Sequence, residues 1–195
     1  MKIGVLGLQG AIQEHINQIE MLGCFGVIIK NPEQLEEVDG LILPGGESTA
    51  IRKLIDRYGF FDPLKQFSSN HKPIFGTCAG MVLVAKELSE SQDSHLGLID
   101  ICVKRNAFGR QKESFEAELT VKGIKTSYPA VFIRAPYIER ANENIEILAT
   151  YDNQIVAAKQ NHILVSSFHP ELTGDTRFLQ LFVDMVKESL KTTVN

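Results

Sequence analysis

The chain has 195 residues, of which 44% are hydrophobic and 23% are charged, fractions close to those of an average globular protein. Its formal net charge of −4 argues against a nucleic-acid-binding surface, and no apolar run approaches the roughly 18 residues that a membrane span requires. The opening MKIGVLG is too short for a signal peptide, and no break in composition divides the chain, so we expect one domain over residues 1–195.

Short apolar runs alternate with helical periodicity in the first half of the chain. The apolar runs predict strands over residues 2–8, 25–29, 40–43 and 73–75. Helices are predicted over residues 11–22, from 49 or 50 to about 58, around 63–67 and from about 80 to 88, with a short helical or turn segment at 35–38. This alternation, with its short connections, predicts a mostly parallel sheet with helices on both faces.

The second half of the chain has shorter strand-like runs separated by turn signals. These runs predict strands over residues 99–103, 115–121, 131–133, 145–150, 155–159 and 163–167. We expect them to form antiparallel hairpins that extend or flank the parallel sheet. Asp175 or Thr176 is predicted to cap a terminal helix. The apolar face of that helix would comprise Phe178, Leu181, Phe182, Met185 and Val186.

Cys78 lies in the sequence FGTCAG at residues 75–80, between an apolar run and a helical segment. A Gly-x-Cys-x-Gly pattern in this place predicts a sharp strand-to-helix turn that presents the thiol, the sulfur counterpart of a nucleophile elbow. A helix N-terminus favours negative charge, so this position also favours the thiolate. A buried structural cysteine is the usual alternative, and we keep that interpretation for Cys24 and Cys102.

His169 and Glu171 flank a proline in the sequence FHPE at residues 168–171. A residue before proline prefers extended backbone, and residues i and i+2 of an extended chain point to the same face. The carboxylate of Glu171 could then orient one ring nitrogen of His169 while the other nitrogen faces Cys78. The three residues therefore predict a Cys-His-Glu triad. The other histidines lack the spacing of metal ligands, so we interpret them as structural and expect no metal or cofactor: His15, His71, His95 and His162.

The sequence LPGGEST at residues 43–49 follows the third predicted strand. It could be a phosphate cradle, but it lacks the lysine of a P-loop. We expect it instead to approach a developing oxyanion, with the backbone amides of Gly46 and Ala79 as the two donors of an oxyanion hole. Since parallel sheets carry their sites at the carboxyl ends of strands, this loop and the Cys78 turn should converge on one crevice.

Two arginines have settings that are unusual for solvated surface residues. Arg134 follows the apolar run VFI and precedes Ala-Pro, whereas Arg105 opens the polar segment RNAFGRQ at residues 105–111. Either guanidinium group could bind a carboxylate bidentately, as the α-carboxylate of an amino-acid substrate would require.

Taken together, these motifs resemble those of the triad glutamine amidotransferases. The cysteine elbow, the Pro-Gly-Gly loop and the His-Pro-Glu ending are typical of that whole group. Within it, GLQG at residues 7–10, RNAFGRQ at 105–111 and FIRAP at 132–136 are similar to segments of the glutaminase subunits of pyridoxal 5′-phosphate synthase. The resemblance runs in order from Ile3 to about Val186, and it implies a flavodoxin-like three-layer αβα fold.

The resemblance also implies a reaction, a set of substrate contacts and a partner. Cys78 would attack the side-chain amide of L-glutamine to give a glutamyl thioester and ammonia, with His169 as general base and then acid. The ammonia would pass to a separate synthase subunit in a hetero-oligomeric complex, and the glutaminase would be weak until docked. Apart from the resemblance, we expect helix 11–22, Gln9 and the glycine loop to form the docking surface. The family's glutamine contacts fall on Gly46, Glu47, Ser48, Arg105, Ile133 and Arg134.

Three alternatives stay open on the sequence alone. The chain could be a free-standing cysteine peptidase or γ-glutamyl hydrolase on a similar scaffold, or a non-catalytic ligand-binding module that retains the fold. It could also be a glutaminase that serves another biosynthetic acceptor, as in histidine or nucleotide synthesis. Its three cysteines include no Cys-x-x-Cys pair and do not make a disulfide framework, so we expect a cytoplasmic protein.

Overall fold

A ten-stranded sheet runs through the protein, which this computed structural model describes over residues 1–91, 94–106, 108 and 113–193. One half of the sheet is parallel and has the strand order β2-β1-β3-β4-β12. Its strands are β1 (Lys2–Leu6), β2 (Phe25–Ile29), β3 (Gly40–Leu43), β4 (Ile74–Thr77) and β12 (Ile163–Ser166). This order is that of the flavodoxin-like sheet, with β12 in the place of its fifth strand.

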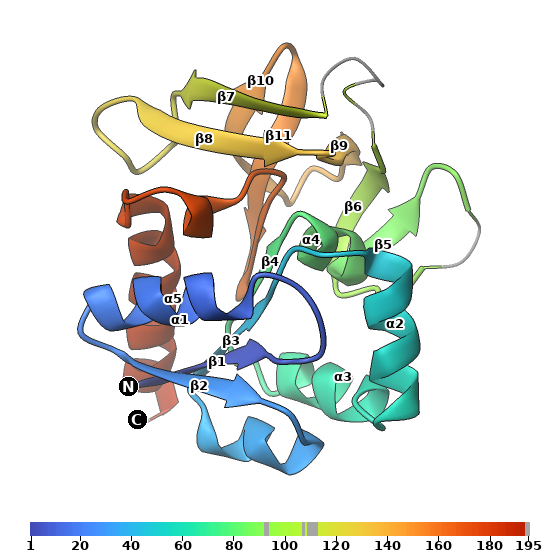
Figure 1. Ribbon diagram of the computed structural model, residues 1–195, viewed down its shortest axis with the longest axis vertical. Coiled ribbons are helices and arrows are strands. Elements are labelled where there is room, and N and C mark those ends of the chain that lie inside the picture. Colours follow the sequence, from blue (N-terminus) through green and yellow to red (C-terminus); the bar gives the residue numbers. More distant parts are fainter. Residues whose placement is uncertain (92–93, 107, 109–112, 194–195) are drawn as a thin grey trace.

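The other half of the sheet is largely antiparallel and continues from β12 in the order β11-β9-β6-β5, with β10 paired to β11. Strands β7 and β8 form a separate antiparallel pair at the same end of the molecule (Figure 1). The strands are β5 (Ala85–Leu88), β6 (Ile99–Lys104), β7 (Ser114–Leu119), β8 (Tyr128–Ile133), β9 (Tyr137–Ala141), β10 (Glu146–Tyr151) and β11 (Gln154–Gln160).

Helices cover both faces of the parallel half, which makes the predicted three layers (Figure 1). One face carries α1 (Ile12–Met21) and α5 (Arg177–Thr193), and the other carries α2 (Ser48–Arg57), α3 (Phe61–Ser69) and α4 (Ala79–Val84). Two short 3₁₀ turns complete the fold, η1 (Pro32–Glu37) and η2 (Pro170–Leu172). The αβα architecture predicted from the sequence is therefore confirmed.

The terminal helix shows how the packing follows from the sequence. Phe178, Phe182 and Val186 are fully buried, as the helical spacing predicts, and both phenylalanine rings contact Phe75 of β4. Leu181 and Met185 are only partly buried. Asp175 caps the start of the helix, because its carboxylate accepts a hydrogen bond of 3.0 Å from the backbone N–H of Arg177.

Two predictions about secondary structure were wrong or incomplete. The helix expected from about residue 80 to 88 ends at Val84, and Ala85–Leu88 is strand β5, parallel to β6. A run as apolar as GMVLVA fits a buried helix or a buried strand equally well. The hydrophobic pattern therefore does not show where helix α4 ends and strand β5 begins. Strand β9 was not predicted, since Tyr137–Ala141 has too few alternating positions to signal a strand.

Among the described residues, no helix is long and apolar enough to cross a membrane.

Candidate active site

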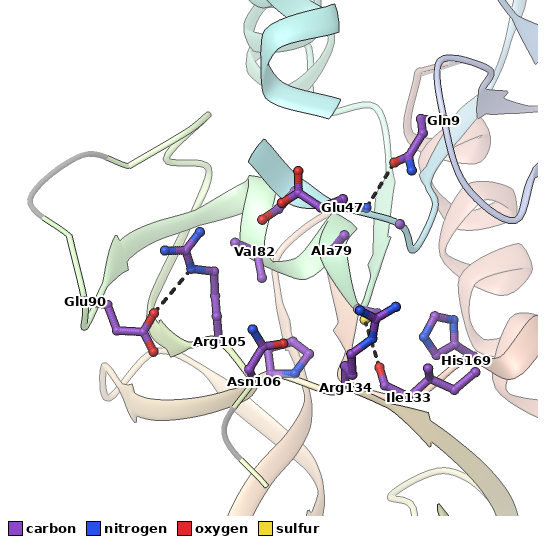
Figure 2. A pocket seen from close by; sticks show the side chains of 14 residues that line it. Gln9, Glu47, Ala79, Val82, Glu90, Arg105, Asn106, Ile133, Arg134 and His169 are labelled. Atoms are coloured by element: carbon purple, nitrogen blue, oxygen red, sulfur yellow. Dashed lines mark hydrogen bonds and ion pairs between the residues drawn. The ribbon is translucent and has the colours of Figure 1, made fainter. Parts of the chain in front are cut away.

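A cavity of about 530 Å³ opens at the carboxyl ends of the parallel strands. The segments that follow β1, β3, β4 and β12 all contribute to it, as the rule for parallel sheets predicts. Figure 2 shows side chains from these loops and from the antiparallel half facing one another across this space. The residues that line it are Gln9, Gly46, Glu47, Ser48, Cys78, Ala79, Val82, Glu90, Arg105, Asn106, Ile133, Arg134, Pro136 and His169.

Cys78 occupies the predicted turn between β4 and α4. Its φ of +49° is rare for a non-glycine residue, and its backbone N–H donates to the carbonyl of Ser166 on neighbouring β12 at 2.8 Å. The turn is tight because Gly80 packs directly against the carbonyl oxygen of Leu43, where any Cβ would clash. The thiol is 7% exposed and lies 3.9 Å from the carbonyl oxygen of Ile133. The nucleophile elbow inferred from the glycine spacing is therefore present in the backbone.

The imidazole of His169 and the carboxylate of Glu171 form a buried pair. Nδ1 of His169 lies 2.7 Å from Oε1 of Glu171, and the two residues are 8% and 6% exposed. The predicted pairing is correct. His169 is non-helical, as expected before a proline, with φ −105° and ψ 89°, but the chain does not stay extended as far as Glu171. Pro170 opens the 3₁₀ turn η2, so Glu171 reaches back across a turn instead of along a strand. A proline at the first position of a helical turn explains this, since its fixed φ suits helical backbone.

The charges of this pair stabilise each other. Burial alone would lower the pKa of His169, but hydrogen bonding to Cys78 and Glu171, together with their negative charges, raises it to about 10. Burial alone would raise the pKa of Glu171, but the interactions of its carboxylate with His15 and His169 hold it below its ordinary value. At neutral pH the arrangement therefore favours an imidazolium ring between a carboxylate and the cysteine sulfur.

Gly45 is the point at which the loop after β3 meets the cysteine and the histidine. A Cβ built on Gly45 would lie 2.5 Å from Cε1 of His169 and 3.4 Å from Cβ of Cys78. Only a residue without a side chain allows this approach. The Pro-Gly-Gly motif contains both glycines, but only Gly46 was expected to have a role in the site.

The rest of this loop is held by two side chains. Oε1 of Gln9, from the loop after β1, accepts a hydrogen bond of 3.0 Å from the backbone N–H of Glu47. The carboxylate of Glu47 in turn accepts bonds of 3.0 and 2.7 Å from the N–H groups of Thr49 and Ala50, so it caps α2. Burial opposes ionisation of Glu47, but these backbone donors keep its pKa below the ordinary value.

The two arginines singled out in the sequence both line the cavity. Ile133, the residue before Arg134, places its carbonyl oxygen 3.9 Å from the cysteine sulfur. Figure 2 shows the two arginine side chains extending toward the loop that carries Glu47. Nε of Arg105 lies 3.4 Å from the carboxylate of Glu90. Of the RNAFGRQ segment that Arg105 opens, Ala107 and residues 109–111 lie outside the described residues.

The structure brings every predicted site residue to this one place. Gly46, Glu47, Ser48, Arg105, Ile133 and Arg134 line the cavity with Cys78, Ala79 and His169, while Glu171 lies buried behind His169. Sequence reasoning missed His15, which it treated as structural. Nε2 of His15 lies 3.5 Å from Oε2 of Glu171, and no linear motif joins the two residues.

Within the described ranges, no group of three or more His, Cys, Asp or Glu side chains is placed to hold a metal ion.

Comparison with known sequences gives long matches. A model of the SNO glutamine amidotransferase family matches residues 5–188. Pyridoxal 5′-phosphate synthase subunit PdxT of Geobacillus kaustophilus (strain HTA426) is 59% identical over 189 residues, which are 97% of this chain and 96% of that protein. The subunit of the same name from Bacillus licheniformis is 54% identical over 194 residues, which are 100% and 99% of the two chains.

Comparison with solved structures agrees with the sequence matches. A crystal structure described as a glutamine amidotransferase has a TM-score of 0.90 and 42% identity, and the match covers 95% of this chain and 98% of that one. PurLQS from Thermotoga maritima, at 13% identity and a TM-score of 0.69 over 94% of this chain and 97% of the other, shares the fold alone. The elbow, the buried His-Glu pair and these matches over nearly the whole length show that the chain belongs to the SNO glutamine amidotransferase family.

Proposed function

We propose that this chain is a single glutaminase domain that hydrolyses L-glutamine and supplies ammonia to the synthase subunit of pyridoxal 5′-phosphate synthase. The observation that carries the proposal is the cavity itself, in which a cysteine elbow and a histidine face two arginines and Glu47. A thiol with an imidazolium neighbour supplies acyl-transfer chemistry, and the opposite charges around it suit a zwitterionic amino acid. The relatives named PdxT supply the pathway.

In the bound state, glutamine would place its charged end among Arg105, Arg134 and Glu47. The guanidinium groups suit the α-carboxylate, and Glu47, whose lowered pKa keeps it anionic, suits the α-ammonium group. The side-chain amide would then reach past Ile133 to the sulfur of Cys78. The backbone amides of Gly46 and Ala79 are our proposed donors to the amide oxygen.

The reaction would proceed in two halves. The thiolate of Cys78 attacks the amide carbon, and the C–N bond breaks as ammonia leaves with the proton of His169. In the second half, neutral His169 takes a proton from water and the resulting hydroxide attacks the thioester. The C–S bond breaks to restore the thiolate, and the new carboxyl group loses its proton to solvent as glutamate is released. Glu171 keeps Nδ1 of His169 protonated throughout, so that Nε2 serves both steps.

Replacing Gly45 with alanine should lower the turnover of glutamine by about a hundredfold, because the new methyl group would displace the His169 ring by more than the tolerance of the reaction. Steady-state glutamate release measures this effect. Gly174→Ala is the matched control, since no atom lies within 4 Å of its Cβ position and we expect unchanged turnover. Wild-type turnover by Gly45→Ala would show that the ring position is not critical.

The partner provides the test of the proposed function. Glutamate release by the purified chain should rise about tenfold or more when the synthase subunit is added, and the amide nitrogen of glutamine should appear in the synthase product. We place docking on α1, Gln9 and the loop at residues 44–49, because Gln9 holds the backbone of that loop at Glu47. Equal rates with and without the synthase subunit would argue for an independent hydrolase.

A substrate panel separates the remaining alternatives. A γ-glutamyl hydrolase or a peptidase would cleave γ-glutamyl conjugates or peptides faster than free glutamine, whereas we expect free L-glutamine alone to be turned over. A non-catalytic module would cleave none of them. We propose the cytoplasm as the site of the reaction, because a catalytic thiol at Cys78 works best where thiols are kept reduced.

A further inference from the structure

One buried side chain outside the cavity reaches the triad. His15 lies on the inner face of α1 and is 1% exposed. Its Nε2 atom lies 3.5 Å from Oε2 of Glu171 and 3.3 Å from the hydroxyl of Thr77, the residue before the cysteine. His15 therefore sits where three separate segments meet: α1, the end of β4 and the turn η2.

The second oxygen of Glu171 has no hydrogen-bond partner among the described residues. Oε1 faces His169, whereas Oε2 is buried and lies 3.5 Å from Nε2 of His15, too far for a well-formed hydrogen bond as the two groups now stand. A buried carboxylate oxygen without a donor costs free energy and leaves the carboxylate free to rotate. The ring of His15 is placed to donate to this oxygen, which would reduce the free-energy cost and stop the carboxylate from rotating.

The proton of His15 can be assigned from its surroundings. Burial is the main cause that lowers the pKa of His15, so the ring is neutral at pH 7. Nδ1 has no hydrogen-bond partner in the described part of the chain, whereas Nε2 faces an anion and a hydroxyl. The tautomer with its proton on Nε2 therefore fits the site, and it points an N–H group at Glu171.

The same face of α1 also holds the backbone of the turn. One helical turn after His15, the side-chain amide of Gln18 donates to the carbonyl oxygens of Pro170 and Thr173 at 2.8 and 2.9 Å. Gln18 is 3% exposed. Two neighbouring side chains of α1 thus contact the segment that carries Glu171, one through its backbone and the other through its carboxylate.

We infer that His15 is a positioning residue of the triad: its Nε2–H group holds one carboxylate oxygen of Glu171 so that the other stays on His169. This inference rests on the triad proposed above, and it extends that triad to a chain of four groups from α1 to the sulfur. The hydroxyl of Tyr128 on β8 also interacts with Glu171 and stays neutral because burial raises its pKa. On α1 itself, the charge of Glu14 opposes the lowering of the pKa of His15, which burial dominates.

The test compares two polar replacements of different length. His15→Gln keeps a side-chain N–H near the position of Nε2, whereas His15→Asn is too short to reach Glu171. We expect the Asn variant to lower kcat for glutamine about tenfold with little change in KM, and the Gln variant to recover most of this loss. His162→Gln is the control. His162 is also hydrogen-bonded to a hydroxyl group, that of Ser68, but it lies at the end of β12 away from the cavity.

A second measurement needs no turnover. Nitrogen NMR of the imidazole rings in the full-length chain should show His169 losing its proton at a lower pH in His15→Asn than in the wild type, His15→Gln or His162→Gln. An unchanged titration of His169 in His15→Asn overturns the inference, even if kcat falls. If His169 responds to His15 but the complex hydrolyses no glutamine, the positioning role stands and the proposed function fails.

Discussion

Cys78→Ala should reduce glutamate release by about 10⁶-fold, to the background of the assay, because no other group in the cavity can form the thioester. The backbone should tolerate the change. Alanine is smaller than cysteine, and the strained turn is fixed by the Gly80 contact with Leu43 and by the bond from residue 78 to Ser166. Thermal unfolding should therefore remain close to that of the wild type.

The matched control for this variant is Cys102→Ala. Cys102 is buried on β6 and does not line the cavity, so its loss should lower stability slightly and leave turnover intact. Measurable glutaminase activity in Cys78→Ala, beyond what trace contamination explains, would refute the assignment of the nucleophile.

Glu171→Gln should lower kcat by about 10³- to 10⁴-fold, the usual cost of neutralising the carboxylate that orients a catalytic histidine. Burial lowers the pKa of His169, but hydrogen bonds to Cys78 and Glu171, together with their negative charges, raise it to about 10. A raised pKa means that the ring is protonated below that pH and loses its proton above it. Without the charge of Glu171 the pKa of His169 falls, so the basic limb of the pH–rate profile should move to lower pH.

The pH dependence of kcat/KM, measured from pH 6 to 11 as far as the fold permits, checks this second prediction. Asp175→Asn is the matched control. Asp175 lies four residues after Glu171 in the chain, its carboxylate pairs with Arg177, and it does not line the cavity. We expect it to affect stability alone. A basic limb at the same pH in Glu171→Gln and the wild type would contradict the proposed role of Glu171.

Local sequence signals were sufficient for most of the fold. Strands β2 and β3 have the predicted bounds, because each is a short apolar run between clear turn residues. The signals failed where local preference and packing diverge. Val84 and Ala85 belong to one apolar run, yet α4 ends and β5 begins between them because β6 offers a pairing edge to the chain at this point.

The site divides in the same way. Cys78, His169 and Glu171 could be found from the sequence because the glycine spacing and the His-Pro-Glu motif are local patterns. His15 and Gly45 could not, since their importance comes from contacts across the fold: His15 is 156 residues from Glu171 and Gly45 is 124 residues from His169. The helix face acquires its role only after α1 has packed against η2, and the loop acquires its role only when Gly45 has come up against His169.

Strand β8 touches the reacting groups with alternate carbonyl oxygens. That of Val131 accepts the backbone N–H of His169 at 2.8 Å, and that of Ile133 lies 3.9 Å from the sulfur. Arg134 is the next residue, so one piece of backbone sets both the position of the thiol and the position of the guanidinium proposed to hold the substrate. Because both positions are fixed by one strand, the site selects the length of the substrate side chain. Asparagine, one methylene shorter than glutamine, would leave its amide carbon short of the sulfur when its carboxylate is bound, and a misplacement of about 1 Å is enough to slow a reaction about a hundredfold.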